Sequence, residues 1–223
     1  MSIYLSRLLL NPRSRRVISE MAHPYEMHRT LMRAFPSATD DTKLKARDEF
    51  GVLYRADVDD QGSAVKVLVQ SLVEPDWSFL DGQNYLCADT KVPPCEHKDI
   101  MLAFRNIQNG QLLRFRLRAN VCKRVGAKGD PLFGKRVAVY REEAQRDWLI
   151  GRGRAGGYEP IGFRVGKQGE VRSRKNGRHA IHFGVTFDGT LRVSNAHALV
   201  ETMRKGIGPA KAFGFGLLSL ARA

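Results

Sequence analysis

The sequence predicts an α+β protein built from two tandem domains, and three observations lead to this prediction. The chain has 223 residues, 43% of them hydrophobic, which can supply a buried core for one large domain or for two of about 100 residues each. Strand-like and helix-like segments follow one another in both halves. Regular patterning weakens after residue 75, where Asp81-Gly82 and Pro93-Pro94 are turn signals. We therefore expect an N-terminal domain at residues 1–92 and a C-terminal domain at residues 98–223.

The first half opens with a strand and two short helices. Residues 3–10 alternate loosely between apolar and polar side chains and predict a strand. Residues 13–21 and 24–35 predict helices, the second beginning at a proline, which a helix tolerates in its first turn. Residues 50–54 and 65–73 then predict two paired strands.

The second half contains the clearest strand of the chain, Leu113-Arg114-Phe115-Arg116-Leu117-Arg118, whose alternation puts apolar side chains on one face and arginines on the other. The other predicted elements are a strand at 134–140, a helix at 141–150, hairpin turns at Asn176-Gly177 and Asp188-Gly189, a helix capped by Asn195 that runs through Lys205, and a strand at 213–220. Each half is thus compatible with the order β-α-β-β-α-β of ferredoxin-like (RRM-like) domains, although the last helix and strand of the first half are poorly signalled. That fold hosts many functions and does not decide the activity.

The charge of the chain indicates a polyanionic partner. Lysine and arginine number 37 against 23 acidic residues, a formal net charge of +14. We favour nucleic acid over an anionic membrane surface, and over the alternative that the cations only keep the protein in solution. No segment approaches the ~20 apolar residues of a membrane span. The run at residues 3–10 is interrupted by Arg7 and followed by arginines, the reverse of a signal peptide, so we expect a cytoplasmic protein.

The cysteines do not predict a disulfide framework or a metal site. Three are present: Cys87, Cys95 and Cys122. They lack CxxC spacing, and an odd number indicates ordinary reduced thiols. Cys95-Glu96-His97 could contribute to a metal site, but no second cluster of matching spacing accompanies it. We expect no metal and no small-molecule cofactor.

Two glycine-rich segments lead to different predictions. Residues 151–156 match the dinucleotide-binding spacing GxGxxG, but they follow a helical segment and precede Tyr158-Glu159-Pro160 where a helix should begin, so we reject that function. Residues 206–216 have glycines, Gly208 among them, that allow backbone amides to approach a phosphate, and Lys211 supplies a charge. A tight connection between packed layers is the alternative.

The helix at residues 24–35 places three functional side chains together. On a helical wheel its apolar stripe consists of Met27, Leu31, Ala34 and Phe35. His28 lies at the edge of this stripe, Tyr25 is three residues earlier on the same surface, and Arg29 falls on the polar side. Taken alone, a histidine at such an edge is more often a packed side chain than a catalytic one.

This combination suits metal-independent cleavage of RNA. RNA carries its own nucleophile, the 2′-hydroxyl, so a protein has only to align it and transfer two protons. Histidine is suited to this because its unperturbed pKa is about 6.5. Tyr25 would orient the substrate or donate a hydrogen bond, and Arg29 would oppose negative charge on the phosphorane. His23, Tyr25 and Lys211 are all candidates for a second proton-transfer group.

Two basic surfaces are candidates for RNA contact. One is the arginine face formed by Arg114, Arg116 and Arg118; a solvated strand face is its alternative. The other is the predicted hairpin tip with Arg172, Arg174, Lys175 and Arg178. In a two-residue hairpin Lys175 and Arg178 stand opposite each other and repel, and a bound polyanion would relieve this repulsion. A flexible, hydrated tip is the alternative.

Several segments, in order along nearly the whole chain, resemble one known family. They are Leu10-Asn11-Pro12, Pro24-Tyr25-Glu26-Met27-His28-Arg29-Thr30-Leu31, Glu74-Pro75-Asp76-Trp77, the strand 113–118 with Ala119-Asn120, and the glycine-rich segment 206–218. The sequence is similar in these segments to the CRISPR-associated endoribonucleases that mature guide RNA within the type I-E Cascade complex.

The resemblance implies tandem ferredoxin-like domains that bind a CRISPR repeat stem-loop and cleave at the 3′ base of the stem, without metal, leaving a 2′,3′-cyclic phosphate and a 5′-hydroxyl. It implies that His28 is the catalytic histidine, with Tyr25 as its helper, and that Arg172 and Arg174 belong to a hairpin inserted into the RNA groove. It also implies that the enzyme keeps its product within Cascade, which agrees with the net charge.

Two rival interpretations remain open. One is a non-catalytic RNA-binding scaffold of the same fold in which His28 only packs. The other is a protein that binds double-stranded DNA through the same charge, although no helix-turn-helix or zinc-finger pattern supports it. Cleavage of RNA distinguishes the predicted enzyme from both.

Overall fold

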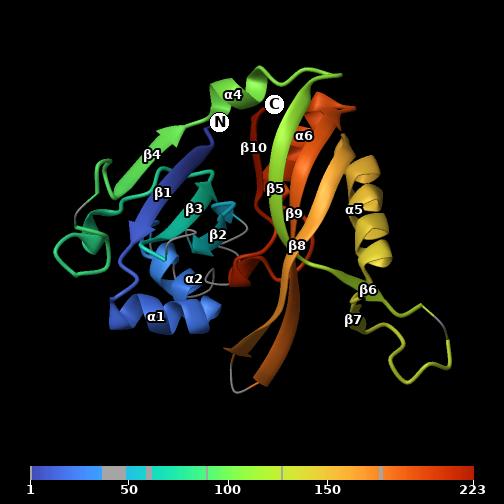
Figure 1. Ribbon diagram of the computed structural model, residues 1–223, viewed down its shortest axis with the longest axis horizontal. Coiled ribbons are helices and arrows are strands. Elements are labelled where there is room, and N and C mark those ends of the chain that lie inside the picture. Colours follow the sequence, from blue (N-terminus) through green and yellow to red (C-terminus); the bar gives the residue numbers. More distant parts are fainter. Residues whose placement is uncertain (1, 37–48, 59–61, 89, 127, 176–177) are drawn as a thin grey trace. The chain divides into compact units, whose positions relative to one another are not determined.

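The computed structural model describes residues 2–36, 49–58, 62–88, 90–126, 128–175 and 178–223 (Figure 1). It is a mixed α and β structure with antiparallel sheets, as predicted. The chain forms two compact units. The first consists of Met1–Asn106, Ser173–Lys175 and Lys211–Gly214, and the second of Ile107–Arg172, Asn176–Ala210 and Phe215–Ala223. No helix in the described part of the chain is long and apolar enough to cross a membrane.

The first unit has a four-stranded sheet with the strand order β2-β3-β1-β4, in which all neighbours are antiparallel. Its elements are β1 (Tyr4–Leu10), α1 (Arg15–Ala22), α2 (Pro24–Met32), β2 (Leu53–Val58), β3 (Val65–Ser71), the 3₁₀ turn η2 (Ser78–Leu80), β4 (Cys95–Asp99) and α4 (Met101–Arg105). The predicted strands and helices of this half are confirmed within a few residues. Because β4 pairs with β1, the unit continues past the expected boundary at residues 92–98.

The core of the first unit is formed by the apolar faces of α1 and α2 against the sheet. The stripe predicted on the wheel is buried, with Met27 and Leu31 at most 1% exposed and Ala34 and Phe35 at most 6%. These side chains pack in one cluster with apolar residues of β1, β2 and β3. Burial of this stripe fixes how α2 is rotated, and therefore which side chains it presents at the edge of the core.

The second unit has the strand order β10-β5-β9-β8 and a separate pair, β6 and β7. Its elements are β5 (Leu112–Asn120), β6 (Cys122–Arg124), β7 (Arg136–Ala138), α5 (Glu142–Gly156), β8 (Tyr158–Lys175), β9 (Arg178–Val193), α6 (Ala196–Lys205) and β10 (Leu218–Arg222). Figure 1 shows α5 and α6 running alongside the sheet, and β8 and β9 extending beyond its other strands. The predicted cap of α6 is confirmed, because Asn195 Oδ1 accepts a hydrogen bond of 2.9 Å from the amide of Ala198.

The predicted hairpin turn at Asp188-Gly189 is wrong. Both residues lie within β9, opposite Arg116 and Phe115 of β5. Gly189 is needed for close packing rather than for a turn, since a Cβ there would stand 2.5 Å from the Cβ of Phe163 on β8. The other predicted turn, Asn176-Gly177, lies outside the described residues, between the end of β8 and the start of β9.

The two glycine-rich segments fold differently from each other. Residues 151–156 are the last turns of α5, and β8 begins at Tyr158, so no helix follows the glycines and the dinucleotide-binding context is absent there. The second segment ends before the last strand, which starts at Leu218 instead of the predicted residue 213. A 3₁₀ turn, η3 (Lys211–Phe213), occupies the earlier positions and belongs to the first unit.

Candidate active site around His28

His28 lies on α2, at the margin of the first unit's core, and is 9% exposed. Its imidazole ring stacks on the ring of Tyr54 from β2, with ring centroids 6.4 Å apart and an interplanar angle of 11°. The ring of Tyr25 is 6.1 Å away at 41°. The structure therefore brings together His28 and Tyr25, as predicted, and adds a second tyrosine.

Tyr54 was not predicted as a site residue. It is 1% exposed, and its hydroxyl donates a hydrogen bond of 2.6 Å to the carbonyl oxygen of Pro24, the first residue of α2. The same hydroxyl lies 3.5 Å from the carbonyl oxygen of Ala212. Tyr54 thus joins strand β2 to the first turn of the helix that carries His28. Its only sequence signal was its place in a predicted strand.

The turn η3 completes this cluster from the far end of the sequence. The ring of Phe213 lies 5.9 Å from that of Tyr25. Gly214 has a φ of +79°, and a Cβ there would stand 3.2 Å from the ring of Tyr54. The glycine therefore allows the backbone of η3 to lie against Tyr54. Lys211 begins this turn, so the predicted glycine-rich segment does bring a lysine to the unit that contains His28.

The other predicted helpers on this helix lie on its surface. Arg29 is exposed, and its guanidinium forms an ion pair of 2.9 Å with Glu26, which partly offsets its charge. His23 caps the junction of α1 and α2, with its Nδ1 3.0 Å from the carbonyl oxygen of Ser19. These contacts support the local helix structure, and they do not orient Arg29 or His23 toward the Tyr25–Tyr54 pair.

A buried carboxylate fixes α2 from its opposite side. Glu20 of α1 is 5% exposed and accepts hydrogen bonds from Arg16 at 2.9 Å, from Thr30 at 2.6 Å and from Tyr85 at 2.5 Å. Burial, with the adjacent Glu20 carboxylate, raises the pKa of the Tyr85 hydroxyl. Because Thr30 is on α2, this network holds α2 against α1. His28 therefore stands on a helix that is fixed on two sides.

The arginine face of β5 is confirmed in its alternation, but two of its arginines have structural partners. Leu113, Phe115 and Leu117 are buried. Arg116 forms an ion pair with Asp188 across the strand pair, and the guanidinium of Arg118 lies 5.2 Å from the centre of the buried Phe215 ring. Arg114 is exposed, and no ion pair of the described residues includes it.

The basic residues of the predicted hairpin lie on β8 and β9. Arg172 is highly exposed and stands 3.9 Å from Glu170, a long and weak ion pair. The backbones of Arg174 and Lys175 belong to the first unit, and Arg178 begins β9 in the second. The side chains of these last three lie outside the described part of the structure.

Gly208 has a packing role in the structure. Its φ is +80°, and a Cβ there would stand 3.3 Å from the indole ring of Trp148 on α5. This contact agrees with the alternative interpretation of the segment, a tight connection between packed layers.

The other titratable clusters do not form a metal site. Among the residues that the structure describes, no group of three or more His, Cys, Asp or Glu side chains is arranged to hold a metal ion. Cys95 and Cys122 are half-buried, and burial raises the pKa of the Cys95 thiol to about 11. His97 is hydrogen-bonded to Glu74 at 3.1 Å.

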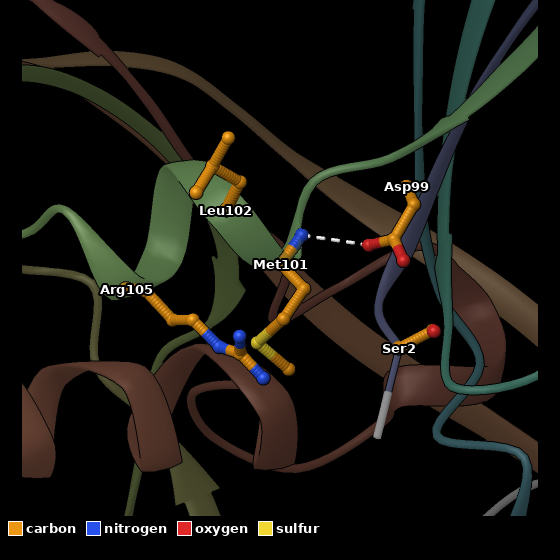
Figure 2. A pocket seen from close by; sticks show the side chains of 5 residues that line it. All are labelled: Ser2, Asp99, Met101, Leu102 and Arg105. Carbon is orange, nitrogen blue, oxygen red and sulfur yellow. Dashed lines mark hydrogen bonds between the residues drawn. The ribbon is translucent and has the colours of Figure 1, made fainter.

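A surface pocket of about 390 Å³ lies at the junction of β4 and α4, apart from the residues of the His28 cluster. Figure 2 shows its lining, with Asp99 accepting a hydrogen bond from the Met101 amide and with Ser2, Leu102 and Arg105 around it. That amide hydrogen bond lowers the pKa of Asp99. The pocket holds the carboxylate of Asp99 and the guanidinium of Arg105 at an open surface, and the Ser2 side chain is hydrogen-bonded to that carboxylate.

Comparisons with known proteins agree with each other. The family model described as CRISPR associated protein matches residues 3–222. The chain is 36% identical to the CRISPR-associated endoribonuclease Cse3 of Thermus thermophilus, over 98% of this chain and 100% of that protein. It is 30% identical to the CRISPR system Cascade subunit CasE of Escherichia coli, over 88% of this chain and 91% of that one. The structure of Thermus thermophilus Cse3 bound to an RNA that represents a pre-cleavage complex has a TM-score of 0.79 and 33% identity, covering 99% of this chain and 100% of that one.

Proposed function

The chain belongs to the CRISPR associated protein family, and from this premise we propose that it is an endoribonuclease that binds the stem-loop of CRISPR repeat RNA and matures guide RNA. The two curated relatives are named an endoribonuclease and a Cascade subunit, and the structural neighbours include RNA complexes. RNA and the other Cascade subunits are therefore its partners. A cytoplasmic location belongs to the same proposal, in keeping with RNA as the substrate.

The observation that carries a catalytic rather than a scaffolding function is the arrangement around His28. The imidazole lies against Tyr25 of its own helix and stacks on Tyr54 of β2, and Phe213 of η3 packs in turn on Tyr25. Such a support restricts the orientation of His28, which is what proton transfer to or from a bound phosphodiester requires.

The reaction follows from the chemistry of RNA. The 2′-hydroxyl attacks the adjacent phosphorus, a bond forms between O2′ and phosphorus, and the bond from phosphorus to O5′ breaks. One proton leaves the 2′-hydroxyl and one is delivered to the 5′-oxygen, so the products are a 2′,3′-cyclic phosphate and a 5′-hydroxyl. In this proposal His28 makes one of these transfers, and Tyr25 hydrogen-bonds the substrate. The route needs no metal, because the nucleophile belongs to the RNA.

We propose that the side chain of Lys211 stabilises the negative charge that develops on the phosphorane. This assignment is supported by its place at the start of η3, whose last residue, Phe213, contacts Tyr25. Arg29 was the sequence-based candidate for this work, but its ion pair with Glu26 and its exposure favour a supporting role at the rim. A positive charge that faces the scissile phosphate stabilises the transition state more than the bound substrate.

Each unit fits the ferredoxin-like fold, in a tandem arrangement. Both sheets have the antiparallel strand order that β-α-β-β-α-β requires when the fourth strand lies beside the first. The second unit has the full order β5-α5-β8-β9-α6-β10, with β6 and β7 inserted. In the first unit the 3₁₀ turn η2 takes the place of the second helix. We assign the catalytic helix to the first unit, and most of the glycine-rich loop and of the basic hairpin's two strands, apart from Ser173–Lys175, to the second.

RNA binding in this proposal depends on exposed cations that acidic groups engage weakly or not at all. Arg114 and Arg172 are exposed. Arg174 and Lys175 lie on β8 with Arg172, and Arg178 begins the neighbouring strand β9. Arg116 and Arg118 contribute to the surface potential, although Asp188 and Phe215 also engage them. The formal net charge of +14 favours retention of the cleaved stem-loop.

The proposed reaction is tested with the cognate repeat RNA and the whole protein in excess EDTA. We expect cleavage at the 3′ base of the stem, and a product that carries a 2′,3′-cyclic phosphate. A substrate with a single 2′-deoxy substitution at the scissile nucleotide should bind with the same Kd and remain intact. Cleavage of the deoxy substrate would exclude attack by the 2′-hydroxyl. Tight binding of the normal RNA without any cleavage would support the scaffold instead.

A further inference from the structure

Residues 122–126 and 128–141 form a projecting element of the second unit that none of the functions above uses. We call it the β6–β7 ribbon. It is inserted between β5 and α5, and Figure 1 shows it extending away from the four-stranded sheet. An insertion of this kind is not needed for the order β-α-β-β-α-β, so its retention calls for a reason outside the core of the fold.

The ribbon is strongly basic. It contains six cations, Lys123, Arg124, Lys128, Lys135, Arg136 and Arg141, and one acidic residue, Asp130. All six cations are exposed. The carboxylate of Asp130 accepts a hydrogen bond of 2.7 Å from the amide of Leu132 within the ribbon's own loop. The ribbon therefore has an excess of five positive charges at physiological pH.

Within the described ranges of the chain, no acidic group forms an ion pair with a cation of the ribbon. The ion pairs of the described residues involve cations of both units, among them Arg7, Arg16, Arg116, Arg146 and Arg204. None of these pairs includes a cation of the ribbon. A fold that pairs many of its arginines but leaves one projecting element unpaired concentrates its positive potential there, and a polyanion is the complementary partner.

Exposed aromatic rings accompany the cations. Phe133 is 52% and Tyr140 is 64% exposed, and the neighbouring Leu132 is 43% exposed. The ring of Tyr140 also contacts Phe183 of β9, with centroids 4.7 Å apart at 60°, so it is a supported platform and not a loose side chain. Cations with exposed rings are the combination that binds single strands, because every unpaired base offers a face for stacking. A duplex uses the cations alone, since its bases are already stacked.

The ribbon is also held in shape before any partner binds. Val125 and Lys135 are joined by a backbone hydrogen bond of 2.9 Å, and the Gly134 amide bonds to the Val125 carbonyl at 2.8 Å. At its base, Val139 bonds to Val121 at 3.0 Å, and the Gln145 side chain of α5 donates to the Val139 carbonyl at 2.9 Å. A pre-formed surface loses little conformational entropy when it binds.

We propose that the β6–β7 ribbon binds the single-stranded RNA that adjoins the repeat stem-loop, with Lys135, Arg136 and their neighbours on the phosphates and Phe133 or Tyr140 stacked on a base. This inference rests on the proposed function, which supplies the stem-loop. It adds a second RNA subsite, which would distinguish a stem-loop within a long transcript from an isolated one.

The test compares two RNAs by fluorescence anisotropy: the minimal repeat stem-loop, and the same stem-loop with a single-stranded extension on either side. The proteins are the wild type, Lys135→Ala/Arg136→Ala and Phe133→Ala, with Lys98→Ala/Arg105→Ala as a charge-matched control on the first unit. Wild type should bind an extended RNA more tightly than the minimal one. The ribbon double variant should bind that extended RNA about tenfold more weakly. The slope of its log affinity against log salt concentration should be smaller in magnitude by about 1.4, at ~0.7 for each of two lost phosphate contacts.

The outcomes separate this inference from the proposed function. Phe133→Ala should lower the affinity for the extended RNA without changing the salt dependence of binding. The control should bind both RNAs as wild type does. If wild type neither binds nor cuts the minimal stem-loop, the proposed function fails. The single-strand subsite is wrong if wild type binds the two RNAs with equal affinity. It is also wrong if the ribbon double variant lowers the affinity for both RNAs equally, or lowers the affinity for neither. An equal loss of affinity for both RNAs would mean that the ribbon binds the duplex. No loss of affinity for either RNA would mean that the ribbon binds a protein partner instead.

Discussion

The hydroxyl of Tyr54 offers a sharp test of how His28 is positioned. The change Tyr54→Phe keeps the ring that stacks on His28 and removes only the hydroxyl that donates to the Pro24 carbonyl at 2.6 Å. Tyr54 is 1% exposed, so water does not replace the lost donor at once. Pro24 also begins α2, whose own backbone hydrogen bonds remain. We therefore expect the loss of one buried hydrogen bond, about 1 kcal/mol.

That loss should appear in stability and in rate. For a unit of this size, about 1 kcal/mol corresponds to a Tm lower by about 4–8 °C. The first turn of α2 becomes less tightly fixed to β2, so the single-turnover cleavage rate should fall by about tenfold or more, while the Kd for the stem-loop changes little. Differential scanning fluorimetry and single-turnover kinetics measure the two effects.

Tyr4→Phe is the matched control, because Tyr4 is a half-buried tyrosine on β1 whose ring packs against His97. It should leave both Tm and rate close to those of wild type. A Tyr54→Phe protein with unchanged Tm would show that the hydrogen bond to Pro24 contributes nothing. An unchanged rate with a lowered Tm would show that Tyr54 supports the fold and has no part in positioning His28.

Three further substitutions test the fold of the two units. Glu20→Gln should lower the free energy of unfolding by about 1.5–3 kcal/mol in denaturant titrations, because an amide cannot accept all the hydrogen bonds that this buried carboxylate accepts. As a control, Glu96→Gln at an exposed ion pair should change the free energy of unfolding by less than about 1 kcal/mol. Asn195→Ala should cost about 1 kcal/mol and speed hydrogen exchange at the Ala198 amide; unchanged exchange would mean that the cap contributes nothing. Gly189→Ala should destabilise the second unit by about 1–3 kcal/mol, since its Cβ would meet the backbone of β8, and a Tm equal to that of wild type would contradict the close approach.

The helix that carries His28 was predictable because its information is local. The apolar stripe has helical spacing, the proline marks the start, and the rotation of the helix follows from burial. The same holds for β5, whose strict alternation requires only adjacent residues, and for the Asn195 cap. In each case the deciding interactions lie within one or two turns or along one strand.

The parts that the sequence did not predict depend on contacts between distant segments. Tyr54 meets His28 only because β2 packs beside α2, and η3 arrives from a position more than 150 residues further along the chain. Asp188-Gly189 has the composition of a turn, but the glycine there serves the packing of β8. Strand β4 reads Cys-Glu-His-Lys-Asp and pairs on one side only, with β1, so it lacks the apolar alternation of an interior strand.

Single-turnover cleavage of the repeat RNA by His28→Ala in excess EDTA tests the central claim most directly. His197→Ala, an exposed histidine on α6, is the control for the loss of an imidazole. Removing a proton-transfer group should slow cleavage by about 10²–10⁴-fold, while the Kd for the stem-loop stays within about twofold and the control cuts as wild type does. Cleavage by His28→Ala at the wild-type rate would contradict the assignment of His28 as the proton-transfer residue.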